Sequence, residues 1–241
     1  MENTERNELF MSKIMKSTGN EFEFYNTVTI AGKIIYKAAI KGANVFTVSV
    51  KRFRNGAPDY TRISVFFEGA VGSTYDKLFE LGDMVVISGV CQKARNYNIA
   101  RDEVKIYGLT MAPKIRKGNE IPDQRVMNIR GRISRTVVIS NDVLLVYLYT
   151  NVHKKFRNPN RESDKEFFED DYISETPVAI YRNKDGEHDV SIIVKELTKG
   201  TWLDVSGWIN TRYTTLKNGK RITEQQIVTR DVYVIGEIQP E

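Results

Sequence analysis

The chain has 241 residues, 41% of them apolar and 28% charged, and its formal net charge is +5 at pH 7. This length allows one large or two ordinary domains, and the charge favours a polyanionic partner over a cationic one. The single cysteine, Cys91, excludes an intramolecular disulfide and suits a reducing compartment. No run approaches about 18 apolar residues, so no membrane helix is expected. Residues 1–22 are polar and lack the apolar core of a secretion signal. We therefore expect a short helix or a loose arm at the N-terminus of a cytoplasmic protein.

Five strands are expected in the first half, at residues 26–36, 44–53, 60–68, 83–91 and 103–109. The second strand alternates with period two, so that Phe46, Val48 and Val50 share one face. The third strand turns Ile63, Val65 and Phe67 one way and Tyr60, Arg62 and Phe66 the other. A helix is expected at 72–81, ended by Gly82.

The second half repeats this order, with strands at 126–137, 143–154, 174–182, 201–213 and 222–235 and a helix at 188–198. The phrase NTVTIAGKII around Gly32 matches RVMNIRGRIS around Gly131, and LGDMVVISGVC matches KGTWLDVSGWI. Five strands with a helix between the third and fourth is the order of an OB-fold barrel. We therefore predict an all-β protein with short helices, built from two tandem OB-fold five-stranded barrels at 23–112 and 125–241, joined by an aperiodic linker at 113–124.

These stretches resemble bacterial-type single-stranded DNA-binding proteins. The match includes VKRFR and DYTRISVFFEG in the first half and VHKKFR, PVAIYR and RYTTLKNGKR in the second. The resemblance implies sequence-independent binding of single-stranded DNA in replication, recombination or repair, and a homodimer that brings four barrels together, with replication or recombination proteins as further partners. The family's long acidic tail does not follow IGEIQPE. A viral or mobile-element member, acting at the nucleoid in its host's cytoplasm, would fit that ending.

The family stacks bases on aromatic side chains at the end of the second strand, along the third, and on the hairpin of the fourth and fifth. Carried over by position, these sites are Phe53, Tyr60, Phe66 and Tyr97 in the first half, and Phe156, Tyr181 and Tyr213 in the second.

The residues point the same way without the family. Basic side chains are interleaved with outward aromatics, so that cations can follow phosphates while rings take bases. Asn218-Gly219 makes a tight turn that places four basic residues on a hairpin. The remaining candidate nucleic-acid-binding residues are Lys51, Arg52, Arg54, Arg62, Lys93, Arg95, Tyr147, Tyr149, Lys154, Lys155, Arg212, Lys217, Lys220 and Arg221.

Other interpretations stay open. The outward aromatics, Tyr147, Tyr149 and Trp208 above all, equally suit a subunit or domain interface. Two OB barrels can also serve as a protein-interaction adaptor or inhibitor, or bind RNA. The insertion 158–174 is either a solvated loop or a flap over a ligand. Tyr36 and Tyr107 are expected to be packing residues rather than DNA contacts.

No enzymatic signature is present in the sequence. There is no phosphate-binding G-x-x-x-x-G-K-[ST] loop and no nucleophile elbow. His153 and His188 are far apart in sequence and lack a cysteine partner, so zinc is not expected. Glu169, Asp170 and Asp171 suit a solvated loop better than a magnesium site. We therefore expect no catalytic residue, metal or cofactor, and we expect Cys91 to fill a buried strand end.

Overall fold

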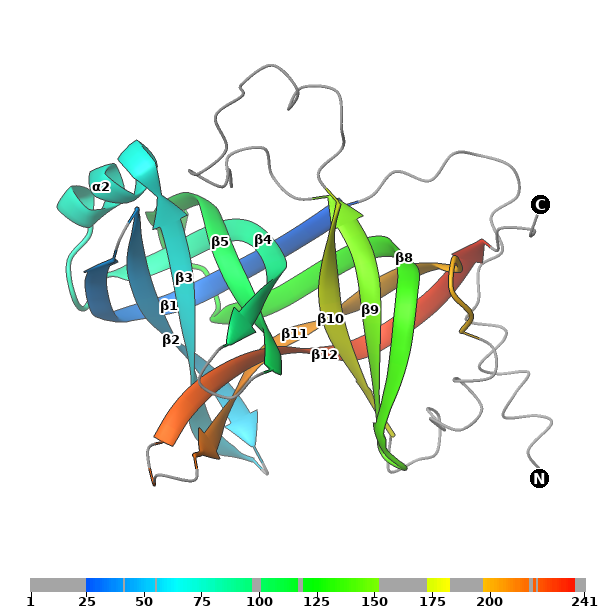
Figure 1. The fold of residues 1–241 in the computed structure, drawn as a ribbon. Helices are drawn as coiled ribbons and strands as arrows, with labels where there is room; N and C mark the ends of the chain where they lie inside the picture. The colour runs from blue at the N-terminus through cyan, green and yellow to red at the C-terminus, as the bar shows by residue number, and fades with distance from the viewer. Residues whose placement is uncertain are drawn as a thin grey trace, which may run out of the picture.

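A computed structural model describes residues 25–40, 42–54, 56–96, 101–116, 119–151, 173–182, 197–216, 219 and 221–236. The first half contains the strands β1 (Tyr25–Ile40), β2 (Ala43–Arg54), β3 (Ala57–Glu68), β4 (Met84–Asn96) and β5 (Arg101–Pro113), with the helix α2 (Gly69–Leu78) after β3. The second half contains β8 (Gln124–Ser140), β9 (Val143–Asn151), β10 (Ile173–Tyr181), β11 (Trp202–Thr215) and β12 (Arg221–Gly236) (Figure 1).

The strands of the first half close into a five-stranded barrel. β1 pairs with β2, β2 with β3, β3 with β5, β5 with β4, and β4 returns to β1. All these pairs are antiparallel except β3–β5. This is the predicted OB-fold order, and the all-β prediction is confirmed. Most of the real strands run a few residues beyond the predicted ones, because the alternation fades where strands leave the core.

The same cycle of pairing recurs in the second half, from β8 through β9, β10, β12 and β11 back to β8. The division into two separate domains stays a prediction, because the strands join one ten-stranded sheet. β1 and β8 connect the halves through an antiparallel ladder in which Val28 faces Met127. These two residues occupy the same place in the repeat, four positions before Gly32 and Gly131. The ladder therefore has an approximate twofold axis at this pair.

The barrel core is built from the inward side chains of the alternating strands. Phe46 and Phe67 are fully buried, with ring centroids 5.6 Å apart in an edge-to-face contact. Gly108 is required beside them, since a β-carbon there would lie 2.2 Å from the Phe67 ring. Tyr75, on α2, packs against Phe67 at 5.1 Å and anchors the helix to the barrel.

The helix lies three residues earlier than predicted, at Gly69–Leu78 rather than 72–81. Leu78 and Leu81, both within the predicted helix, are exposed. Gly82 does not cap the helix; it adopts a φ of 100° in the turn before β4. The second predicted helix, 188–198, falls almost wholly outside the described residues. Over the part of the chain that the structure describes, no helix has the length and apolarity needed to cross a bilayer.

The predicted linker is docked rather than loose. It holds the short strands β6 (Ile115–Arg116) and β7 (Asn119–Glu120), and just before them Lys114 is 2% exposed and ion-paired with Asp123. The Lys114 N–H donates to the Met84 carbonyl at 2.8 Å, and the Lys51 N–H donates to the Asp123 carboxylate at 2.6 Å. Asp123 therefore fastens the linker to β2.

Cys91 is buried, as predicted, but it lies within β4 rather than at a strand end. Burial raises the pKa of its thiol far above the ordinary value. The Asn26 side chain donates to the Cys91 carbonyl at 2.5 Å and accepts from its N–H at 2.9 Å. Asn26 also approaches Thr150 of β9 at 3.3 Å. This small polar cluster joins β1 and β4 of the first half to β9 of the second half.

Candidate nucleic-acid interface

The outer face of the β2–β3 hairpin carries the predicted aromatic and basic side chains in register. Lys51 lies opposite Tyr60, and Arg62 lies opposite Ser49. Because their neighbours Val48 and Ile63 are buried in the barrel, the alternation turns these side chains outward. Phe66 lies on the same face, half-buried rather than exposed, with its ring 6.0 Å from Tyr107.

The β11–β12 hairpin of the second half extends this face. The Thr211 hydroxyl donates to the Arg62 carbonyl at 2.8 Å. The Ser64 N–H donates to the Gln225 side chain at 2.6 Å, and that side chain approaches the Val104 carbonyl at 3.4 Å. The hairpin therefore lies across β3 and β5 of the first barrel. Tyr213 follows Thr211 by two residues and shares its side of β11.

We call these outward aromatic and basic residues together the aromatic–basic surface; its members are Lys51, Phe53, Tyr60, Arg62, Phe66, Lys105, Tyr213 and Arg221. Phe53 is 70% exposed, Tyr60 59% and Tyr213 49%. Cations accompany the rings: Lys51 lies 5.4 Å from the Phe53 centroid, and Arg221 lies 4.2 Å from the Tyr213 centroid. Large exposed rings beside cations offer stacking and phosphate contacts together.

Three of the basic residues predicted to bind nucleic acid form ion pairs within the protein instead. Arg52 alternates away from the aromatic–basic surface and forms an ion pair with Asp59 at 2.5 Å. Lys93 contacts Glu175 of the second half at 2.5 Å. Arg212 contacts Glu224, its partner across the hairpin, at 2.6 Å. Their charges are largely offset within the fold, so each is a weaker candidate for phosphate than the sequence suggests.

Glu175 is the centre of the contacts between the halves. Its carboxylate accepts from Lys93 and from Ser134 at 2.7 Å, and Arg135 lies 3.7 Å away. Partial burial alone would raise the pKa of Glu175, but the hydrogen bonds from Lys93 and Ser134 outweigh it and hold the pKa below the ordinary value. The β4–β5 hairpin is thereby fixed to the second half, as the β11–β12 hairpin is fixed to the first.

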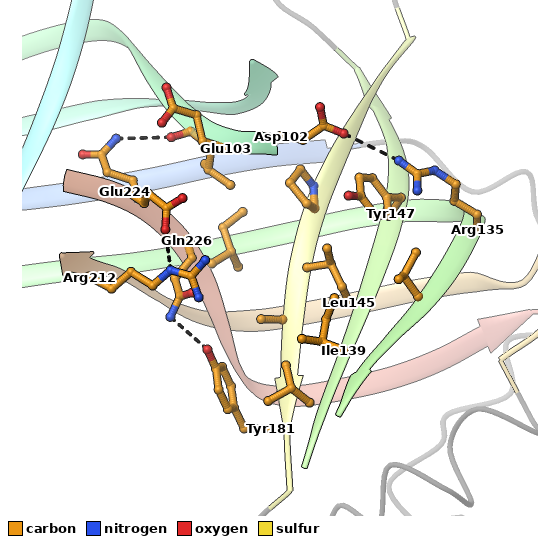
Figure 2. A pocket seen from close by; sticks show the side chains of 17 residues that line it. Asp102, Glu103, Arg135, Ile139, Leu145, Tyr147, Tyr181, Arg212, Glu224 and Gln226 are labelled. Atoms are coloured by element: carbon orange, nitrogen blue, oxygen red, sulfur yellow. Dashed lines mark hydrogen bonds and ion pairs between the residues drawn. The ribbon is translucent and has the colours of Figure 1, made fainter. Parts of the chain in front are cut away.

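The outer face of the second half is hollowed into a pocket of about 520 Å³ (Figure 2). Tyr147 and Tyr181 lie in it, together with Arg212. Tyr147 lies on the predicted outward side of β9, opposite the buried Val146 and Leu148, but it is only 6% exposed because the Arg135 guanidinium covers its ring at 3.4 Å. The Tyr181 hydroxyl accepts from Gln226 at 2.9 Å. Neither ring stands free as those of Phe53 and Tyr60 do.

For several other predicted residues, the exposure differs from the prediction or the residue lies outside the described part of the chain. Tyr36 is 56% exposed, which does not fit the packing role predicted for it, whereas Tyr107 is half-buried as expected. Tyr149 is half-buried on β9, and Trp208 lies under Arg125 at 5.6 Å. Other predicted residues lie outside the described part of the chain: Tyr97, Lys154, Lys155, Phe156, Lys217, Lys220 and the insertion 158–174. For Arg54 and Arg95, only the side chains lie outside it.

Sequence reasoning missed Lys105, whose ammonium lies 5.1 Å from the Phe66 centroid. The signal was present, since Lys105 stands between the buried Val104 and Ile106 and must face outward. It also missed Arg135 and Gln225, whose roles depend on contacts between the halves. Across the described residues, no group of three or more His, Cys, Asp or Glu side chains is arranged to hold a metal ion.

Comparisons with known proteins establish the fold. No protein-family model matches the sequence, and no curated protein matches it. Among solved structures, the chain is similar to the single-stranded DNA binding protein from Thermus aquaticus, with 12% identity over 91% of this chain and 97% of that one, at a TM-score of 0.56. A deletion mutant of the same protein gives 14% identity over 90% and 98%, also at 0.56. The chain therefore shares the fold of those proteins.

Proposed function

We propose that this protein binds single-stranded DNA without sequence preference, as a non-enzymatic component of replication, recombination or repair. The observation that carries the proposal is the aromatic–basic surface, where Phe53 and Tyr60 stand exposed between Lys51 and Arg62 on one face of a barrel hairpin. The shared fold with a single-stranded DNA binding protein supports it.

The mechanism follows from the chemistry of an unpaired strand. Each splayed base offers an apolar ring face, and an aromatic side chain can stack on it whatever the base. The cations beside Phe53, Phe66 and Tyr213 follow the phosphates and release counterions on binding. A duplex hides its base faces in the stack, so it can use only the phosphate part of this surface.

A gel-shift experiment with single-stranded DNA, duplex DNA and RNA of one length tests the proposal. We expect the single-stranded DNA to shift at the lowest protein concentration. Equal shifts with RNA would assign the surface to single strands in general, and no shift with any of the three would overturn nucleic-acid binding.

The salt dependence of binding should report Arg62 directly. Each phosphate contact to a single strand adds roughly 0.7 to the slope of log affinity against log salt concentration. Arg62→Ala is therefore expected to flatten the slope by about 0.7 in titrations of labelled oligo-dT over a salt series. Arg230→Ala, which removes an exposed arginine paired with Asp231 at 2.7 Å, is the matched control and should leave the slope unchanged. A slope unchanged in Arg62→Ala would remove that residue from the interface.

We also propose that two OB-fold units act in each chain, that two chains associate, and that the protein works in the cytoplasm. The recurring pairing cycle supports the first part. Exposed apolar side chains on β1, Ile35, Tyr36 and Ile40, offer area for a second copy. Sedimentation equilibrium tests the association, and a purely monomeric protein at micromolar concentration would contradict it.

A further inference from the structure

The two halves differ at one equivalent place on their outer faces. Gly32 and Gly131 each sit against a strand carbonyl, that of Ser49 and that of Tyr149, and a β-carbon on either glycine would lie 2.3 Å from it. Ser49 of β2 therefore corresponds to Tyr149 of β9, so each residue of β2 corresponds to the residue 100 positions later in β9. Val45 then corresponds to Leu145, and their cross-strand partners, Phe66 and Ala179, correspond as well. The first half fills this place with a ring and the second leaves it hollow.

The hollow has the composition of a binding pocket. Its walls are apolar, from Val137, Ile139, Leu145, Pro177 and Ala179. Its volume of about 520 Å³ falls within the range of roughly 300–1,000 Å³ found for ligand sites. Most of the charged and amide groups come from the β4–β5 and β11–β12 hairpins, whereas Arg135 comes from β8 (Figure 2). An apolar group entering this pocket would leave water without losing hydrogen bonds.

The charge at the rim disfavours nucleic acid. Three carboxylates line the pocket, from Asp102, Glu103 and Glu224, against the two guanidiniums of Arg135 and Arg212. Three negative and two positive charges leave a local net charge of −1, on a chain whose total is +5. Both guanidiniums are already engaged with these carboxylates, Arg135 with Asp102 at 3.7 Å and Arg212 with Glu224 at 2.6 Å. The net negative charge of the rim therefore favours a cationic ligand over a phosphate.

We propose that this pocket is a docking site for a partner protein, which inserts one large apolar side chain flanked by lysine or arginine. The apolar walls accept the side chain as a buried anchor, the arrangement that dominates binding energy in protein interfaces. The net negative charge of the rim attracts the flanking cations and supplies specificity. The second half thereby recruits a polypeptide on the face that corresponds to the DNA-binding face of the first half.

A synthetic heptapeptide with a central leucine between lysine pairs tests the proposal. We expect saturable binding by fluorescence anisotropy, with methyl NMR shifts at Ile139 and Leu145. The same peptide with glutamates in place of lysines should not bind. Ala179→Phe, which places in the second half the ring that the first half carries, should weaken peptide binding at least tenfold. Ala112→Phe, the same change at an exposed alanine of β5, should have no effect.

Ile139→Lys provides a second variant in case the added ring disturbs folding. Ile139 is 60% exposed, so a lysine there keeps the fold while it repels the basic peptide. We expect a loss similar to that of Ala179→Phe, and both variants should bind oligo-dT as the wild type does. The proposal is overturned if the lysine peptide fails to bind the wild type or binds both variants undiminished. It is also overturned if oligo-dT shifts the pocket methyl signals, which would make nucleic acid the occupant.

Discussion

Replacing Phe53 and Tyr60 together with alanine is expected to weaken binding to oligo-dT by about 2–6 kcal/mol. Each ring stacks on one base, and each such stack contributes roughly 1–3 kcal/mol. The smallest of these losses corresponds to about a thirtyfold higher Kd. The two rings are 70% and 59% exposed, so their removal takes little from the core. A fluorescence anisotropy titration at one fixed salt concentration measures the effect.

Leu78→Ala is the matched control for this pair. Leu78 is 65% exposed on α2, at the end of β3 away from the turn that joins β2 and β3 (Figure 1). Its truncation should leave both the Kd and the melting temperature unchanged. An unchanged Kd in the double variant, with an intact melting temperature, would refute the role of the aromatic–basic surface.

Replacing Asp123 with asparagine is expected to lower the free energy of unfolding by about 3–5 kcal/mol. The substitution removes the charge of the Asp123 carboxylate from beside the buried Lys114 ammonium, and breaking a buried ion pair from one side costs an amount of this order. Lys114 is only 2% exposed, so water cannot replace the lost partner. Asparagine keeps an acceptor for the Lys51 N–H, so the loss reports mainly on the charge. Urea denaturation followed by circular dichroism measures it.

The control removes both charges. Adding Lys114→Met to Asp123→Asn should recover most of the lost stability, since the double variant leaves no charge buried without its partner. A double variant as unstable as the single one would indicate that the linker is held by other contacts. A single variant within about 0.5 kcal/mol of wild type would show that Lys114 does not need its partner.

The order of the strands could be predicted because each strand buries one face. Side chains such as Val48 and Ile63 recur at every second position, and turn residues separate the runs. The docked structure of the linker could not be predicted, because it depends on distant contacts rather than on periodicity. Lys114 looks like a surface lysine in sequence, and only the fold brings Asp123 and the Met84 carbonyl around it.

The residues of the candidate site also fall into two groups, those that alternation along one strand predicts and those whose exposure depends on contacts with other strands. Tyr60 and Arg62 were predictable, since they alternate with buried neighbours on their own strand. Tyr147 obeys the same alternation, yet Arg135 of the neighbouring strand covers it. Lys93 carries the right charge for phosphate, but its partner Glu175 belongs to the other half of the chain. Alternation gives the face on which a side chain lies; its exposure depends on what the rest of the fold places over that face.

The approximate twofold axis at Val28 and Met127 bears on how the molecule can evolve. In a symmetric pair of identical chains, every substitution appears on both sides of the axis. Here each position exists once, because the two halves belong to one polypeptide. A ring at residue 66 and a methyl group at residue 179 can then be selected independently. A single gene can thus tune its two faces for different ligands while the ladder between them stays symmetric.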